Sequence, residues 1–220
     1  PEPVFRRVSV QRGGCGESPP SAGVQVKENK KVTKRIIAFI YGVACYAAFF
    51  ATFLYAVGFL GNFGVPKSID SGREGSLMAA LAIDGALLAL FALQHSIMAR
   101  QWFKRAWTRI VPEPVERSTY VLLSSAALAL MFYLWEPIGG VVWDMGDGLG
   151  GTVMMGLYFT GLLIVLLSTF LINHFDLFGL RQVYLYLMGR KYTHLKFRTP
   201  FFYGYVRHPL YVGWLLTFWA

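Results

Sequence analysis

The chain has 220 residues, of which 55% are hydrophobic and only 15% are charged. Soluble domains carry about 25% charged residues, so this composition excludes an ordinary soluble domain and indicates a protein in contact with lipid. The formal net charge of +9 is also found in nucleic-acid-binding proteins, but here the basic residues fall in alternate loops between apolar runs, which a nucleic-acid surface would not require.

The first 30 residues are predicted to be a disordered tail. They include the small, polar stretch GGCGESPPSAG, which Gly and Pro interrupt. Their arginines are not followed directly by an apolar stretch and a small-residue cleavage site, so a signal peptide is not expected. Residues 31–220 are predicted to form one membrane domain, which the basic run at residues 27–35 anchors at its start.

Four apolar runs predict membrane-spanning helices. Residues 36–60 and 149–172 contain no charged residue, and residues 75–99 contain only Asp84. Residues 120–135 are a fourth candidate. A bilayer core about 30 Å thick needs roughly 20 apolar residues in a helix. Helices of a soluble core are the alternative, but a chain of this length has little left to cover four of them. The predicted fold is all-α, a multi-pass membrane helix bundle.

Two titratable residues interrupt the run at residues 75–99. Asp84 and His95 lie eleven residues apart, and about 100° of rotation per residue brings them to one face of a helix. An ionised side chain within a bilayer is costly unless it is paired or hydrated. Two interpretations stay open, a functional polar seam facing the bundle interior and a structural hydrogen bond between helices.

The number of lysine and arginine residues alternates between high and low from one loop to the next. They number eight before the first apolar run, two in residues 61–74, five in 100–118, none in 136–150 and six in 173–208. The positive-inside rule therefore places the N-terminus and the segments 100–118 and 173–208 in the cytoplasm. We expect a multi-pass protein of the cell (inner) membrane, with the lipid bilayer as a partner and no nucleic-acid partner.

A fifth apolar helix begins at Pro209. At 1.5 Å per residue, residues 209–220 extend about 18 Å, which is less than the bilayer core. We therefore expect four complete spans and a truncated fifth, with a C-terminally incomplete domain and part of the site beyond residue 220.

The start of that fifth helix predicts an anion site. Pro suits the first turn of a helix, where unpaired backbone N–H groups and the positive end of the helix dipole face outward. Arg207 adds a permanent cation, and His208 adds a titratable donor. Nearby rings that could sit against an aromatic base or a cation belong to Tyr203, Tyr205 and Tyr211. A basic interfacial anchor beside a Pro-started helix is the alternative interpretation.

Residues 205–213, YVRHPLYVG, resemble the R-H-P-x-Y-x-G signature of membrane methyltransferases of the isoprenylcysteine carboxyl methyltransferase kind. The longer pattern resembles the NnrU-like branch of that family. Its segments are QHS at residues 94–96 with AR at 99–100, ERS at 116–118 and NHFDLFGLRQ at 173–182. The resemblance covers roughly residues 35–220.

This resemblance implies methyl transfer from S-adenosylmethionine to a small hydrophobic thiol, with methanethiol giving dimethyl sulfide. The cofactor-binding residues that it implies are Tyr203, Tyr205, Arg207, His208, Pro209, Tyr211 and Gly213. Arg207, His208 and the helix start suit the cofactor's carboxylate, and the tyrosines suit its adenine or sulfonium. In the family, a stretch beyond the fifth span adds acidic residues to this site.

We expect direct in-line transfer to the thiolate sulfur in a site between helices that excludes water. Small thiols have pKa values comparable to or above the value of about 8.5 for cysteine, so deprotonation matters. His174 or His95 could take the proton, with Asp176 orienting the base. The alternative is capture of thiolate from solution without a protein base. No metal site is expected.

Two other functions stay open at the level of sequence. One is methylation of an isoprenoid or other lipophilic acceptor. The other is a non-enzymatic NnrU-like membrane factor associated with haem or denitrification, which requires two histidines on facing helices. No obligate protein partner is inferred.

Overall fold

The computed structural model describes residues 22–72, 75–141, 145–146, 148–193 and 206–220, and of residues 22–27 it describes the backbone alone. All regular structure in these ranges is helical, which confirms the predicted all-α class. The helices are α1 (Ala22–Leu60), α2 (Leu77–Met98), α3 (Gln101–Trp107), the 3₁₀ helix η1 (Glu113–Val115), α4 (Glu116–Leu134), α5 (Leu149–Ile172), α6 (His174–Leu177), α7 (Leu180–Leu187) and α8 (Pro209–Trp219).

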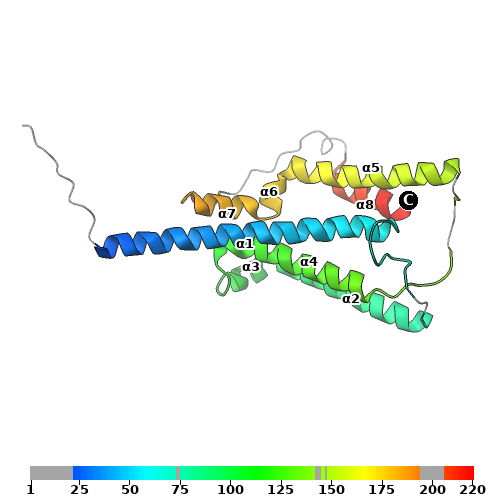
Figure 1. Cartoon of the computed structure of the whole chain (residues 1–220), viewed down its shortest axis with the longest axis horizontal. Coiled ribbons are helices and arrows are strands. Elements are labelled where there is room, and N and C mark those ends of the chain that lie inside the picture. The colour runs from blue at the N-terminus through cyan, green and yellow to red at the C-terminus, as the bar shows by residue number, and fades with distance from the viewer. Residues whose placement is uncertain (1–21, 73–74, 142–144, 147, 194–205) are drawn as a thin grey trace, which may run out of the picture.

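Among the described residues, four helices are long and apolar enough to cross a membrane, so the chain is a multi-pass membrane protein. They lie at Glu28–Leu60, Leu77–Met98, Glu113–Leu134 and Leu149–Ile172. Helix α1 is central: it packs against α4, which packs in turn against α2, and α7 lies along another side of it (Figure 1). Helices α5 and α8 form a separate pair.

We call one end of the bundle the basic end; it comprises the first part of α1, α3, η1, α6 and α7. Residues 22–30, which the sequence analysis assigned to a disordered tail, are helical there as the first turns of α1. Lys, Glu and Gln favour helix, and adding turns to an existing helix needs no new nucleus. This prediction was therefore wrong for residues 22–30, and residues 1–21 lie outside the described residues.

At the opposite end, a small buried cluster joins α1 to α4. Phe59 and Phe132 lie with ring centroids 4.7 Å apart, and Ala56 completes the cluster. Asp84 of α2 is 3% exposed there and accepts a hydrogen bond from the backbone N–H of Glu136 at 3.0 Å. The geometry of Asp84 therefore supports the structural interpretation, a hydrogen bond between segments.

The turn between α6 and α7 lies against the start of α4. Gly179 adopts φ +85°, and a Cβ at this position would lie 2.8 Å from both the backbone nitrogen and the Oγ of Ser118. Glycine is needed here for its left-handed conformation and for the close approach of the two backbones. This contact brings α6 and α7 against α4 at the basic end.

Helices α5 and α8 cross closely at two glycines. A Cβ on Gly161 would lie 2.6 Å from the carbonyl oxygen of Gly213, and one on Gly213 would lie 2.7 Å from that of Gly161. Small residues allow such contacts between helices in lipid. The structure thus gives Gly213, predicted to bind cofactor, a role in helix packing.

Replacing Gly161 with leucine should separate α8 from α5, because its side chain has no room at the crossing. We expect a loss of about 1–3 kcal/mol in the free energy of unfolding, measured by denaturant titration in detergent micelles. Gly156→Leu is the matched control, since no atom lies within 4 Å of a Cβ at Gly156 on the same helix. Equal stability of the two variants would contradict the packing role.

Candidate functional site

The junction of α5 and α6 is shaped by Asn173. This residue has φ +115°, in the left-handed region that Asn tolerates better than most residues. Its side-chain oxygen accepts a hydrogen bond from the backbone N–H of Asp176 at 3.1 Å. The turn therefore ends α5 and begins α6 at once, and it places His174 and Asp176 together at the basic end.

His174 is held by hydrogen bonds on both ring nitrogens. Nδ1 lies 2.9 Å from the Oγ1 of Thr169, and Nε2 lies 2.8 Å from the hydroxyl of Tyr46. Thr169 donates its one hydroxyl hydrogen to the carbonyl oxygen of Leu166 at 2.7 Å, so it accepts from Nδ1–H. The neutral ring then accepts the Tyr46 hydrogen at Nε2.

Aromatic rings surround His174. Phe170 stacks on it with centroids 4.4 Å apart and planes at 7°, and Phe178 meets it edge-on at 4.8 Å. The residue is 5% exposed, and burial lowers the pKa of its imidazole. His174 is therefore neutral near pH 7 and able to accept a proton.

Asp176 is the centre of an ionic network that ties three elements together. Its carboxylate lies 3.2 Å from Arg117 of α4 and 3.1 Å from Arg181 of α7, and it accepts a hydrogen bond from Tyr192 at 3.1 Å. Arg117 also donates to the backbone carbonyl of Asp176 at 2.8 Å. No hydrogen bond among the described residues joins Asp176 to His174, which contacts Tyr46 and Thr169 instead, and the role of Asp176 in orienting a base stays a prediction.

Arg181 extends the network to the segment that follows α7. It donates to the carbonyl oxygen of Thr193 at 2.8 Å and to its Oγ1 at 3.1 Å, and its guanidinium lies 5.4 Å from the ring centroid of Tyr192. The same carboxylate that binds Arg117 thus fixes the chain as far as residue 193.

His95 lies elsewhere, on α2 against α4. Its Nδ1 is 2.9 Å from the hydroxyl of Tyr120 and 3.4 Å from the Oγ of Ser124, and its ring stacks near Phe91 at 5.4 Å. The His95 side chain is exposed at the surface of the bundle. His95 and His174 are therefore held by different partners on different helices.

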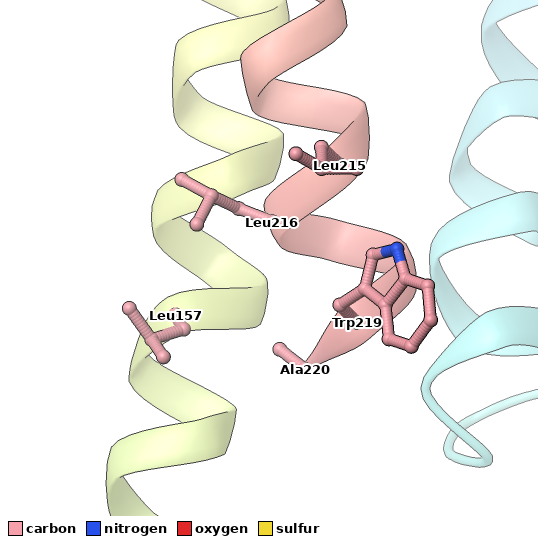
Figure 2. Close-up of a pocket in the computed structure, with 5 residues that line it drawn as sticks. All are labelled: Leu157, Leu215, Leu216, Trp219 and Ala220. Atoms are coloured by element: carbon pink, nitrogen blue, oxygen red, sulfur yellow. The ribbon is translucent and has the colours of Figure 1, made fainter.

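The predicted anion site lies at the start of α8. Helix α8 runs antiparallel to α5, since Gly213 faces Gly161 and the last turn, at Trp219, lies beside Leu157 (Figure 2). Its start is therefore directed toward the end of α5 where α6 begins.

The side chains at that start are arranged around a buried proline. Arg207 and His208 are exposed, Pro209 is buried at the first helical position, and the rings of His208 and Tyr211 lie 5.2 Å apart. Tyr203 and Tyr205 fall outside the described residues. Among the described residues, no hydrogen bond or ion pair joins Arg207 or His208 to His174 or Asp176.

Open grooves on the described surface include two that are lined by none of these polar residues. One, of about 360 Å³, is apolar and is lined by Leu157, Leu215, Leu216, Trp219 and Ala220 (Figure 2). The other, of about 610 Å³, is lined by residues of the first part of α5 and by Gly146. Neither groove has a charged side chain in its lining, so neither suits a polar cofactor.

Sequence reasoning missed Tyr46 and Thr169. Each lies in an apolar run that contains several other uncharged polar residues, so nothing in the sequence distinguishes it from them. Arg117 falls within the resembling segment at residues 116–118, but its partner Asp176 lies 59 positions away and is found only in three dimensions.

Curated proteins similar to the chain were found. It is 59% identical over 185 residues to a methanethiol S-methyltransferase of Crocosphaera subtropica, covering 84% of the chain and 72% of that relative. It is 46% identical over 187 residues to a methanethiol S-methyltransferase of Mycobacterium tuberculosis, covering 85% and 77%. It is 27% identical over 225 residues to nurim of Xenopus laevis, covering 91% and 79%. No family model and no solved structure matches the chain.

Asp176→Asn should destabilise the basic end, because the amide leaves Arg117 and Arg181 without their counter-charge. The partly exposed network should lose about 1–3 kcal/mol in the free energy of unfolding, measured by denaturant titration. Asp70→Asn is the control, since Asp70 is an exposed carboxylate bonded to Asn62 at the opposite end. A loss no larger than that of the control would show that the network does not hold these elements.

Proposed function

The chain belongs to the methanethiol S-methyltransferase family, and on this premise we propose that it transfers a methyl group from S-adenosylmethionine to methanethiol and releases dimethyl sulfide. The observation that carries the proposal is the 59% identity across 84% of the chain to a protein of that name. The membrane bundle is consistent with it, because a small hydrophobic thiol enters lipid readily.

We propose that the basic end faces the cytoplasm of the cell (inner) membrane. Lys and Arg number eight before the first span, five in residues 100–118 and six in 173–208, but none in 136–150. The cytoplasm also holds soluble, charged metabolites of the cofactor's kind. The start of α8 is directed toward this end, so a donor bound there would be supplied from the cytoplasm.

The donor's carboxylate is assigned to Arg207, His208 and the first turn of α8. The residues fit this group: Arg207 is exposed and permanently charged, and it directly precedes His208 and the first turn of α8, whose positive dipole end favours an anion. The ring of Tyr211 is 68% exposed beside His208 and can pack against adenine or the sulfonium. Tyr203 and Tyr205 are proposed to contribute in the same way. When bound, S-adenosylmethionine supplies an electrophilic methyl group on a positively charged sulfur.

The residues of the chain are proposed to deprotonate the thiol. A thiol is mostly protonated at pH 7, and only its thiolate is a strong nucleophile. His174 is the base that we propose, because it is neutral and held in one tautomer by Thr169. His95 is the alternative base. Asp176 holds α4, α6 and α7 together around His174, and the aromatic rings there exclude water.

The activity is tested with membranes that contain the protein, supplied with S-adenosylmethionine and one acceptor at a time. We expect dimethyl sulfide in the headspace with methanethiol, and no methylated product with a prenylated cysteine or an isoprenoid carboxylate. Methylation of a prenylated acceptor alone would contradict the thiol assignment. A folded sample that neither forms product nor binds S-adenosylmethionine would contradict the enzyme class.

Arg207→Ala should weaken binding of S-adenosylmethionine by about 10- to 100-fold, because a charge-assisted bond to the carboxylate is lost. Calorimetry measures the dissociation constant directly, and KM should rise in parallel. Arg109→Ala removes another exposed arginine at the basic end and should leave affinity unchanged. Equal losses in both variants would indicate general charge attraction in place of a specific contact.

A further inference from the structure

Hydrogen bonds at the centre of the basic end run in one direction, from α1 to the backbone of α5. Tyr46 O–H donates to Nε2 of His174 at 2.8 Å, and Nδ1–H donates to Thr169 Oγ1 at 2.9 Å. Thr169 then donates to the carbonyl oxygen of Leu166 at 2.7 Å. Within the part of the chain that the structure describes, no group donates to the Tyr46 oxygen. A phenol hydroxyl that donates one hydrogen bond can also accept one at its oxygen.

Tyr46 is also the accessible member of this chain of bonds. His174 and Thr169 are 5% and 7% exposed, and both nitrogens of His174 are occupied. Tyr46 is only half-buried. Tyr46 is thus the least buried of the three, so we expect a thiol to meet the Tyr46 hydroxyl before the imidazole.

We propose that Tyr46 is the catalytic residue that takes the proton from the thiol, a proposal that rests on the function proposed above. The S–H bond of methanethiol breaks, and its hydrogen bonds to the Tyr46 oxygen as the original Tyr46 hydrogen moves to Nε2 of His174. The S–H electron pair stays on sulfur as the thiolate. His174 becomes an imidazolium that donates to Tyr46 and Thr169, and the reverse shift later returns the proton through Tyr46 to water.

The surroundings of Tyr46 suit a small apolar thiol. Phe49 and Phe178 stack with centroids 3.9 Å apart, and each lies about as far from the Tyr46 ring, at 6.0 and 6.2 Å. Sulfur packs favourably near aromatic rings. A thiolate formed among such rings is poorly solvated, which favours its attack on a cationic methyl donor.

The charged groups near His174 are paired with one another, so none of them holds the proton that His174 would accept. Tyr46 is the titratable group that contacts it from α1, and α5 contributes Thr169 and Phe170, which do not titrate. Asp176 of α6 is engaged by Arg117 of α4 and Arg181 of α7. Burial lowers the pKa of His174, so the imidazolium forms transiently and gives its proton back.

The test is the pH dependence of Tyr46→Phe. At pH 7 we expect the rate of dimethyl sulfide formation to fall about 100-fold, since general base catalysis is lost. As the pH rises past the pKa of the thiol, solution supplies thiolate and the deficit should shrink. Tyr41→Phe is the matched control: Tyr41 lies on the same helix, its hydroxyl is 3.0 Å from Thr119, and its loss should leave the profile unchanged.

Nitrogen-15 NMR of His174 in the cofactor-free protein gives a second readout. The wild type should show the Nδ1–H tautomer, and Tyr46→Phe should lower the titration midpoint of His174, because the imidazolium loses the charge-assisted bond that it donates to the Tyr46 oxygen, which is stronger than the bond to the neutral ring. Tyr41→Phe should not move this midpoint. Thr169→Val should disturb the tautomer, and Thr169→Ser, which keeps the hydroxyl, should preserve it.

A deficit in Tyr46→Phe that is equal at every pH would overturn the proposal, as would an unchanged rate at pH 7. A pH-dependent loss in His95→Ala but not in Tyr46→Phe or His174→Ala would overturn it in favour of the other histidine. A wild-type protein that forms no dimethyl sulfide would instead refute the proposed function. In that case the NMR titration still tests the hydrogen bonds between Tyr46, His174 and Thr169.

Discussion

Lipid offers no hydrogen-bond partners, and this constraint decides where polar groups lie in the bundle. Within the spans, some polar side chains bond to other segments, Asp84 to the N–H of Glu136 and Tyr158 to the carbonyl oxygen of Val57. Others, such as Ser125 and Thr160, donate to carbonyl oxygens of their own helix. Charged side chains gather where the spans end. Chemistry that needs ions, a titratable base and a dry neighbourhood is therefore restricted to such an end, and the basic end supplies all three.

The turn at Asn173 connects the two parts of the structure. Helices α5 and α8 pack closely on each other, whereas α1, α2, α4 and α7 form the larger group. His174 reaches from the end of α5 to Tyr46 of α1, and Asp176 reaches Arg117 of α4. The residues proposed for thiol activation thus also join the α5–α8 pair to the rest of the bundle, so positioning and packing depend on the same contacts.

Much of the fold could be predicted from the sequence, because hydrophobic length controls a membrane span. The run at residues 149–172 gave the bounds of α5 directly, and Pro209 marked the start of α8. Residues 22–30 were assigned wrongly, since a polar composition does not distinguish a tail from the exposed turns of a long helix. The short helices α6 and α7 were not foreseen, because they depend on contacts with α1 and α4.

The sequence indicates which residues are candidates for the site, but not which side chains they contact. His174 and Asp176 were identified from their place in a polar segment after a span, but their partners lie on other helices, 128 and 59 positions away. Gly213 was assigned to the cofactor from its place in a motif, whereas its closest contact is Gly161. Tyr46 has no local feature that separates it from an ordinary interfacial tyrosine.

The central claim is that methyl transfer takes place at the basic end, with the donor supplied from the cytoplasm. The most direct measurement compares sealed inside-out and right-side-out vesicles, with membrane-impermeant S-adenosylmethionine added outside and methanethiol, which crosses lipid, present throughout. We predict dimethyl sulfide from inside-out vesicles alone, until detergent opens the others. Product from intact right-side-out vesicles alone would contradict the account.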